Sequence, residues 1–116
     1  MKNVHTAPLE VLSPRSNGPF ATEPYEAGWA DEALAMIYVR EMTGPTVELL
    51  LRAQISVDGA RWFDHPAAPL RIEKPGGYSL PLTHFGNWLR LAGEVSGGPA
   101  DGTAALVLDL YWVLKG

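Results

Sequence analysis

The chain has 116 residues, of which 47% are hydrophobic and 19% are charged, and its formal net charge is −4 at neutral pH. This length suits a single domain with one core, and the apolar content excludes a chain that is disordered throughout. The acidic balance, with no cluster of Lys and Arg, argues against nucleic acid as a partner. The lack of cysteine removes disulfides, thiolate metal sites and thiol catalysis.

The N-terminal sequence, Met1-Lys2-Asn3-Val4-His5, has no apolar segment behind its lysine. No stretch of the chain approaches the ~18 apolar residues that a membrane span needs. We therefore expect cytoplasmic synthesis, no signal peptide and no membrane partner. A protein that is released by lysis or through a dedicated machine has the same sequence character, which leaves a place in a virion or another released particle open.

Residues 1–30 are expected to form an extended arm or broken edge strands, ahead of a sandwich domain at residues 31–116. The arm contains four prolines, and each fixes φ and removes a backbone donor, which is incompatible with a central strand. Phe20 and Tyr25 are its candidate anchors. The sequence leaves open whether the arm lies on its own domain or reaches a neighbouring subunit.

Residues 31–42 fit two structures. Trp29, Ala33, Met36 and Ile37 would line one face of a helix, and the composition favours helix as well. We predict a strand over Leu34–Glu41 instead, because its centre is rich in β-forming residues and a hairpin-like Thr-Gly-Pro-Thr sequence follows it.

Between Thr46 and Asp58, hydrophobic side chains occupy every second position, and only Leu50 interrupts the pattern. This period of two predicts a strand with one core face and one solvent face. Asp58-Gly59 follows, a dipeptide suited to a tight turn, and Arg61-Trp62-Phe63 begins the return strand of a hairpin.

The rest of the chain alternates short apolar runs with turn sequences rich in Gly, Pro, Asn and Asp. Further strands are predicted at Leu70–Glu73, Tyr78–Thr83, Trp88–Val95 and Ala104–Leu114. Short strands at this spacing are typical of a sandwich or barrel. The sequence therefore predicts an all-β domain, an antiparallel β-sandwich of jelly-roll-like form with an extended Pro-rich N-terminal arm.

The last predicted strand is apolar on both faces. Its even-numbered positions form a core stripe, while the opposite face carries Val107, Asp109, Tyr111 and Val113. A freely exposed face is usually more polar, and Leu34–Val39 has the same two-sided character. We expect these faces to be covered by the N-terminal arm or by another subunit. The predicted interface residues are Phe20, Tyr25, Val107, Tyr111 and Val113.

No catalytic, cofactor-binding or metal-binding residues are predicted. His5, His65 and His84 lack the spacing of metal ligands and are expected at the surface. The carboxylates are scattered, and the sequence has neither a phosphate loop nor a nucleophile elbow.

Four tryptophans are many for this length. Trp88 and Trp112 are expected to be structural, because they fall within predicted strands. Trp62, beside the Asp58-Gly59 turn, is expected to be the most accessible, and together with Trp29 it is a candidate contact for a glycan.

Two segments carry a recurrent pattern, Ser56-Val57-Asp58-Gly59-Ala60-Arg61-Trp62-Phe63 and Phe85-Gly86-Asn87-Trp88-Leu89-Arg90-Leu91, followed by Gly97-Gly98 and an apolar strand ending in Lys115. From about residue 34 to the end, this arrangement resembles small β-sandwich structural proteins of tailed phages and related particles. The resemblance implies a particle component without an active site. Asp-Gly turns followed by tryptophan also occur in carbohydrate-binding sandwiches.

These observations favour a structural subunit of a virion-like or other supramolecular particle. It is not expected to be an enzyme, and its partners would be copies of itself or other particle proteins, contacted through apolar sheet faces and the N-terminal arm. The alternative is a carbohydrate-binding β-sandwich module that uses exposed tryptophans.

Overall fold

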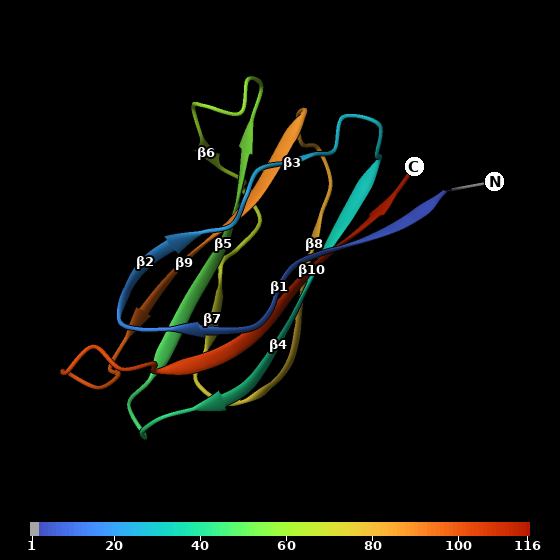
Figure 1. Cartoon of the computed structure of the whole chain (residues 1–116). Coiled ribbons are helices and arrows are strands. Elements are labelled where there is room, and N and C mark those ends of the chain that lie inside the picture. The colour runs from blue at the N-terminus through green and yellow to red at the C-terminus, as the bar shows by residue number, and fades with distance from the viewer. Residues whose placement is uncertain (1–2) are drawn as a thin grey trace.

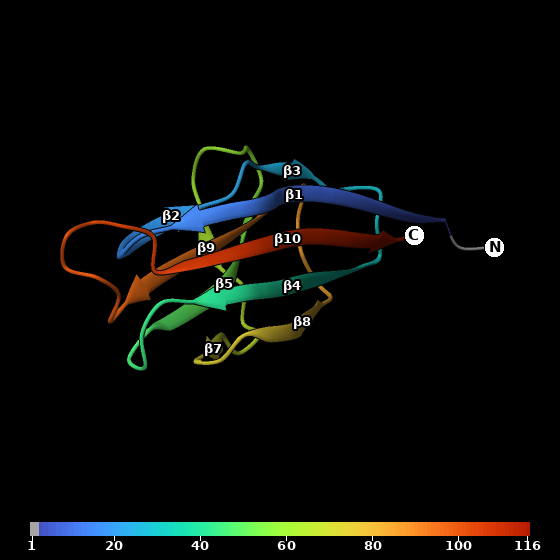
Figure 2. The ribbon, with the colours of Figure 1, turned by 60° about the horizontal axis from the view of Figure 1, so that its bottom comes forward.

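The computed structural model describes residues 3–116, which form ten strands and no helix. The strands make two antiparallel sheets that pack face to face (Figures 1 and 2). The predicted all-β antiparallel sandwich is thus confirmed. Residues 3–116 contain no helix of the length and hydrophobicity that a membrane span requires.

The first sheet has four strands, which lie side by side in Figure 2. In spatial order they are β1 (Val4–Arg15), β10 (Leu106–Lys115), β4 (Glu32–Met42) and β8 (Gly76–Leu82).

The second sheet is built around β9 (Trp88–Ser96) and β5 (Glu48–Ser56). The strands β2 (Gly18–Ala21) and β3 (Tyr25–Glu26) pair with β9, whereas β6 (Phe63–Asp64) and β7 (Leu70–Ile72) pair with β5. Long strands that are adjacent in sequence mostly lie in different sheets, which is the arrangement of a jelly roll.

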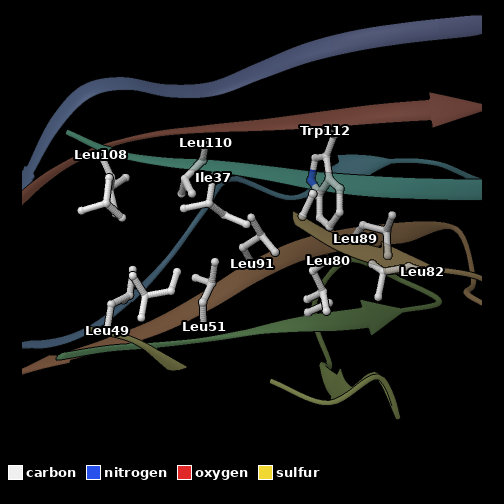
Figure 3. Close-up of a cluster of buried hydrophobic side chains, with 14 of the residues drawn as sticks. Ile37, Leu49, Leu51, Leu80, Leu82, Leu89, Leu91, Leu108, Leu110 and Trp112 are labelled. Atoms are coloured by element: carbon white, nitrogen blue, oxygen red, sulfur yellow. The ribbon is translucent and has the colours of Figure 1, made fainter. Parts of the chain in front are cut away.

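Alternating side chains from the two sheets form the core. β4 buries Ala33, Ala35, Ile37 and Val39, so the strand predicted in this region, rather than a helix, is confirmed. Figure 3 shows side chains of β4 and β10 meeting those of β5 and β9 between the sheets. Those labelled there are Ile37, Leu108, Leu110 and Trp112 from the first pair, and Leu49, Leu51, Leu89 and Leu91 from the second.

The alternation predicted for residues 46–58 holds as far as Ala53 and then reverses. Ser56 is buried and Val57 is exposed, because the chain leaves the sheet at the end of β5. The predicted tight hairpin at Asp58-Gly59 is wrong in its length, since residues 57–62 form a loop before the two-residue strand β6 pairs with β5.

The segment expected to be an arm or edge strands pairs with its own domain. β1 runs antiparallel to β10 from the Val4–Lys115 pair to the Arg15–Leu106 pair, and β2 pairs with β9. Because β1 lies beside β10 in the same sheet, it extends that sheet and does not cover its outer face. The expectation that the arm covers the outer faces of the apolar strands is therefore wrong.

His65 also departs from expectation, since it is buried rather than at the surface. Its Nδ1 accepts a hydrogen bond of 3.0 Å from the backbone N of Ala67, so the proton sits on Nε2, which donates to the carbonyl oxygen of Thr83 at 2.6 Å. The ring joins the segment after β6 to the end of β8 and is structural.

Candidate functional site

The outer side of the first sheet exposes hydrophobic side chains. We call the outward side chains of β4 and β10 the apolar face: Leu34, Met36, Tyr38, Val107, Tyr111 and Val113. Met36 is 45% exposed and Tyr38 is 47% exposed, and the other four are partly buried by their neighbours. Contiguous exposed apolar surface of this kind usually marks a contact site.

An open hollow of about 520 Å³ lies within the apolar face, between β4, β8 and β10. Met36, Tyr38 and Tyr111 line it together with Tyr78 and Gly77. No atom lies within 4 Å of the position that a Cβ on Gly77 would take, so this glycine leaves the side toward β8 open. The hollow combines tyrosine rings with a flexible methionine, and such side chains are enriched at protein interfaces.

The charge nearest the centre of this side of the sheet, that of Asp109, is paired with Arg40. Asp109 of β10 is only 2% exposed, and its carboxylate accepts hydrogen bonds from Arg40 Nε and from Arg40 Nη2, the latter at 2.7 Å. Its Oδ1 also accepts from the backbone N of Leu12 at 2.7 Å. Arg40 first, and Leu12 second, hold the pKa of Asp109 below its usual value. The charged group that borders the apolar face, Asp109, is therefore in a hydrogen-bonded ion pair.

Three of the predicted interface residues, Val107, Tyr111 and Val113, share the apolar face. Met36 and Tyr38 are more exposed than any of these three, and the same alternation in β4 marks their side as outward. The sequence pattern therefore contained the signal for these two residues, although they were not among the predicted interface residues.

The two predicted anchors of the arm, Phe20 and Tyr25, lie elsewhere. Phe20 is half-buried, and its ring occupies the space that a side chain on Gly93 would take. The guanidinium of Arg15 covers the ring, 4.3 Å from its centroid. Tyr25 is half-buried and stacks on the ring of His5 at 6.3 Å. Both side chains attach β1, β2 and β3 to their own domain.

The outer side of the second sheet has a different chemistry. A polar groove of about 400 Å³ runs over β2, β9 and β5, and it is lined by Pro19, Phe20, Ala21, Leu50, Arg52, Gln54, Arg90, Ala92, Gly93 and Glu94. Small residues on β9 and β2 form the hollow, and long polar side chains surround it.

A chain of hydrogen bonds orders one side of the polar groove. Arg90 Nε donates to Gln54 Oε1 at 2.8 Å, and Gln54 Nε2 donates to Asp64 Oδ1 at 2.9 Å. Arg52 pairs with the same carboxylate at 3.3 Å. Gln54 first, and Arg52 second, lower the pKa of Asp64, so it is ionised at neutral pH. The groove thus presents fixed donors and acceptors.

Of the two candidate glycan contacts, Trp62 borders this network and Trp29 does not. The guanidinium of Arg90 lies 4.4 Å from the centroid of the Trp62 ring and covers one face of a half-buried indole. Trp29, in the connection between β3 and β4, is 47% exposed and is thus more accessible than Trp62, so the expectation that Trp62 is the most accessible tryptophan is wrong. Neither tryptophan is among the residues that line the groove.

The two motif segments found in the sequence pack against each other. A Cβ on Gly59 would lie 3.5 Å from the Trp88 ring, and Trp62 stacks on Arg90. The loop that carries Gly59 is ordered by Asp58, whose Oδ1 accepts from the backbone N of Ala60 and of Arg61. These hydrogen bonds lower the pKa of Asp58 strongly. The motif residues thus build the loop and orient Arg90.

Among residues 3–116, no group of three or more His, Asp or Glu side chains is arranged to hold a metal ion.

No protein-family model matches the sequence, and no curated protein matches it either. Among solved structures, the SPBc2 prophage-derived protein YomS superposes with a TM-score of 0.60 at 7% identity, covering 100% of this chain and 96% of YomS. The PBSX exported protein XepA superposes with a TM-score of 0.59 at 11% identity, covering 98% of this chain. The chain spans 36% of the length of XepA.

A xylan-binding CBM22-1 domain from Paenibacillus barcinonensis Xyn10C is also similar, with a TM-score of 0.48 at 13% identity, covering 98% of this chain and 85% of that domain. This similarity is too distant to support an inference about ligands. The comparisons with YomS and XepA establish a shared fold.

Proposed function

We infer that this chain is a non-enzymatic assembly subunit of a virion-like or other supramolecular particle, and that its apolar face docks on a second copy of the chain. The observation that carries this proposal is the exposure of Met36 and Tyr38 beside Tyr111, on a sheet face where the buried carboxylate of Asp109 is paired with Arg40. Leaving such side chains in water costs free energy that association would recover, at about 25 cal/mol per Å² of apolar surface buried.

Charge permits a second copy as the partner. The chain carries a net charge of −4, so two copies repel each other overall, and this repulsion is smallest when they meet through a neutral surface. The apolar face is neutral because Asp109 and Arg40 form an ion pair at its border. The hollow beside Tyr38 lies on this side of the sheet. The exposed Val11 and Leu12 lie next to Asp109, where the pairing of β1 with β10 shifts register between Glu10 and Ser13.

The fold shared with a prophage-derived protein and with the PBSX exported protein supports a place in a phage-like particle. The motif resemblance to structural proteins of tailed phages points the same way. The shared fold and the motif resemblance support only the kind of assembly. The choice of contact surface rests on the exposed side chains of the apolar face.

The test is the mass of the purified chain in solution, measured by size-exclusion chromatography with light scattering at micromolar concentrations. We expect a mass above that of the monomer for the wild type and a monomer for Tyr38→Glu. Val57→Glu is the matched control, because Val57 is also an exposed hydrophobic residue, at 67%, but lies in the loop after β5. A wild type that stays monomeric over the whole range would overturn the proposal.

A further inference from the structure

We propose that the polar groove binds a saccharide that carries carboxylate groups, and that Arg90 receives the carboxylate. This site lies on the outer side of the second sheet, away from the apolar face, and it does not depend on the proposed assembly role.

Arg90 is held in place but lacks a counter-ion. Its Nε donates to Gln54, and its guanidinium plane lies against the ring of Trp62. Within residues 3–116, no carboxylate forms an ion pair with Arg90, whereas Arg52 in the same groove is paired with Asp64. The two Nη groups of Arg90 make no hydrogen bond in the described chain. An oriented guanidinium with free Nη groups suits a bidentate carboxylate.

The remainder of the groove suits a sugar ring. Gln54 and Glu94 offer an amide and a carboxylate, and a hydroxyl group can donate to one and accept from the other. Ala92 lies between them on β9, and Leu50 and Pro19 flank Glu94 on the two neighbouring strands, so that the groove has an apolar floor for the C–H side of a ring. Because Gln54 and Asp64 are already hydrogen-bonded to each other, these side chains lose little conformational entropy when a ligand binds.

The position of the groove favours a saccharide over an acidic peptide. The groove lies over the paired backbones of β2, β9 and β5, so its floor offers no unpaired N–H or C=O groups to an extended peptide. Peptides that add to a sheet require such an open edge. A ligand at this site is recognised through side chains alone, as hydroxyl-rich ligands are.

Isothermal titration calorimetry with oligogalacturonate, oligoglucuronate and oligoguluronate, on the full chain, tests the proposal. We expect binding of at least one of these uronates, at least ~10-fold weaker binding of its methyl ester, and a similar loss in Arg90→Gln, because a hydrogen bond to a charged group is worth about one decade of affinity or more. Arg71→Gln is the matched control, since Arg71 is exposed on β7, pairs with Glu48 and does not line the groove.

A second variant tests the shape of the groove independently of Arg90. Ala92→Leu fills the hollow between β2 and β5 and leaves Arg90 and its partners unchanged, so it should abolish binding while the melting temperature stays near that of the wild type. The proposal is overturned if none of the three uronates binds, if the methyl ester binds equally well, or if oligoglutamate binds as tightly as the saccharide. It also fails if neither Arg90→Gln nor Ala92→Leu weakens binding.

Discussion

The backbone N of Leu12 donates a 2.7 Å hydrogen bond to Oδ1 of Asp109, which lies 97 positions later in the chain. Leu12 occupies the left-handed region at φ 52°, within the stretch of β1 where the pairing with β10 shifts register. Asp109 also accepts from Arg40, next to the register shift between β10 and β4. One buried carboxylate therefore stabilises irregularities in both neighbouring strands.

Asp109 predicts an acid-sensitive component of stability. Its folded pKa is lowered, so its contribution is fully present above the unfolded value of about 3.9 and is lost as the pH falls through the folded value. Asp109→Asn removes the charge and should melt at a lower temperature than the wild type at neutral pH. The difference in melting temperature should shrink below pH ~4. A difference that is independent of pH would show that the carboxylate charge is not what stabilises the bulge.

Leu12→Gly should raise the free energy of unfolding by up to about 1 kcal/mol. A leucine in the left-handed region costs about 1–2 kcal/mol, and glycine relieves this strain at some cost in unfolded-state entropy. Leu12 is 61% exposed, so little burial is lost. Val11→Gly is the control, since Val11 is also exposed but has no positive φ, and this variant should be destabilised. Urea denaturation measures both.

Gly97→Ala should destabilise the chain more than Gly102→Ala does. Both glycines have positive φ, which costs any other residue about 1–2 kcal/mol. A Cβ on Gly97 would also lie 1.9 Å from the carbonyl oxygen of Thr46, whereas nothing lies within 4 Å of a Cβ on Gly102. The backbone around Thr46 must therefore move in the first variant only. Equal losses in thermal melts would show that the contact with Thr46 is relieved at no cost.

Trp112→Ala should lower the free energy of unfolding by about 3–5 kcal/mol, because it empties the largest fully buried side-chain volume in the described core. Trp112→Phe should cost much less. The phenyl ring keeps most of the packing, and the indole Nε1 that it removes has no hydrogen-bond partner within residues 3–116. Chemical denaturation of the two variants gives the comparison, and similar losses would argue that Nε1 is satisfied in solution.

The candidate sites were only partly predictable. Val107, Tyr111 and Val113 could be assigned to an outer face because alternation along β10 is a local property, and the same rule identifies Met36 and Tyr38 on β4. The polar groove could not be found this way. Its central contacts join β5, β6 and β9, which are distant in the sequence. No pattern within one strand indicates that Gln54 lies opposite Arg90.

The sequence by itself determined the all-β class, most strand positions after residue 30 and the inward side of β5 and β10, because a period of two depends only on neighbouring residues. The tertiary structure alone decided that β1 pairs with β10, that Asp109 is buried beside Arg40, and that His65 is a structural side chain. These outcomes depend on which distant strands become neighbours. That choice is made by the packing of the whole core and by the hydrogen bonds that each buried polar group must find.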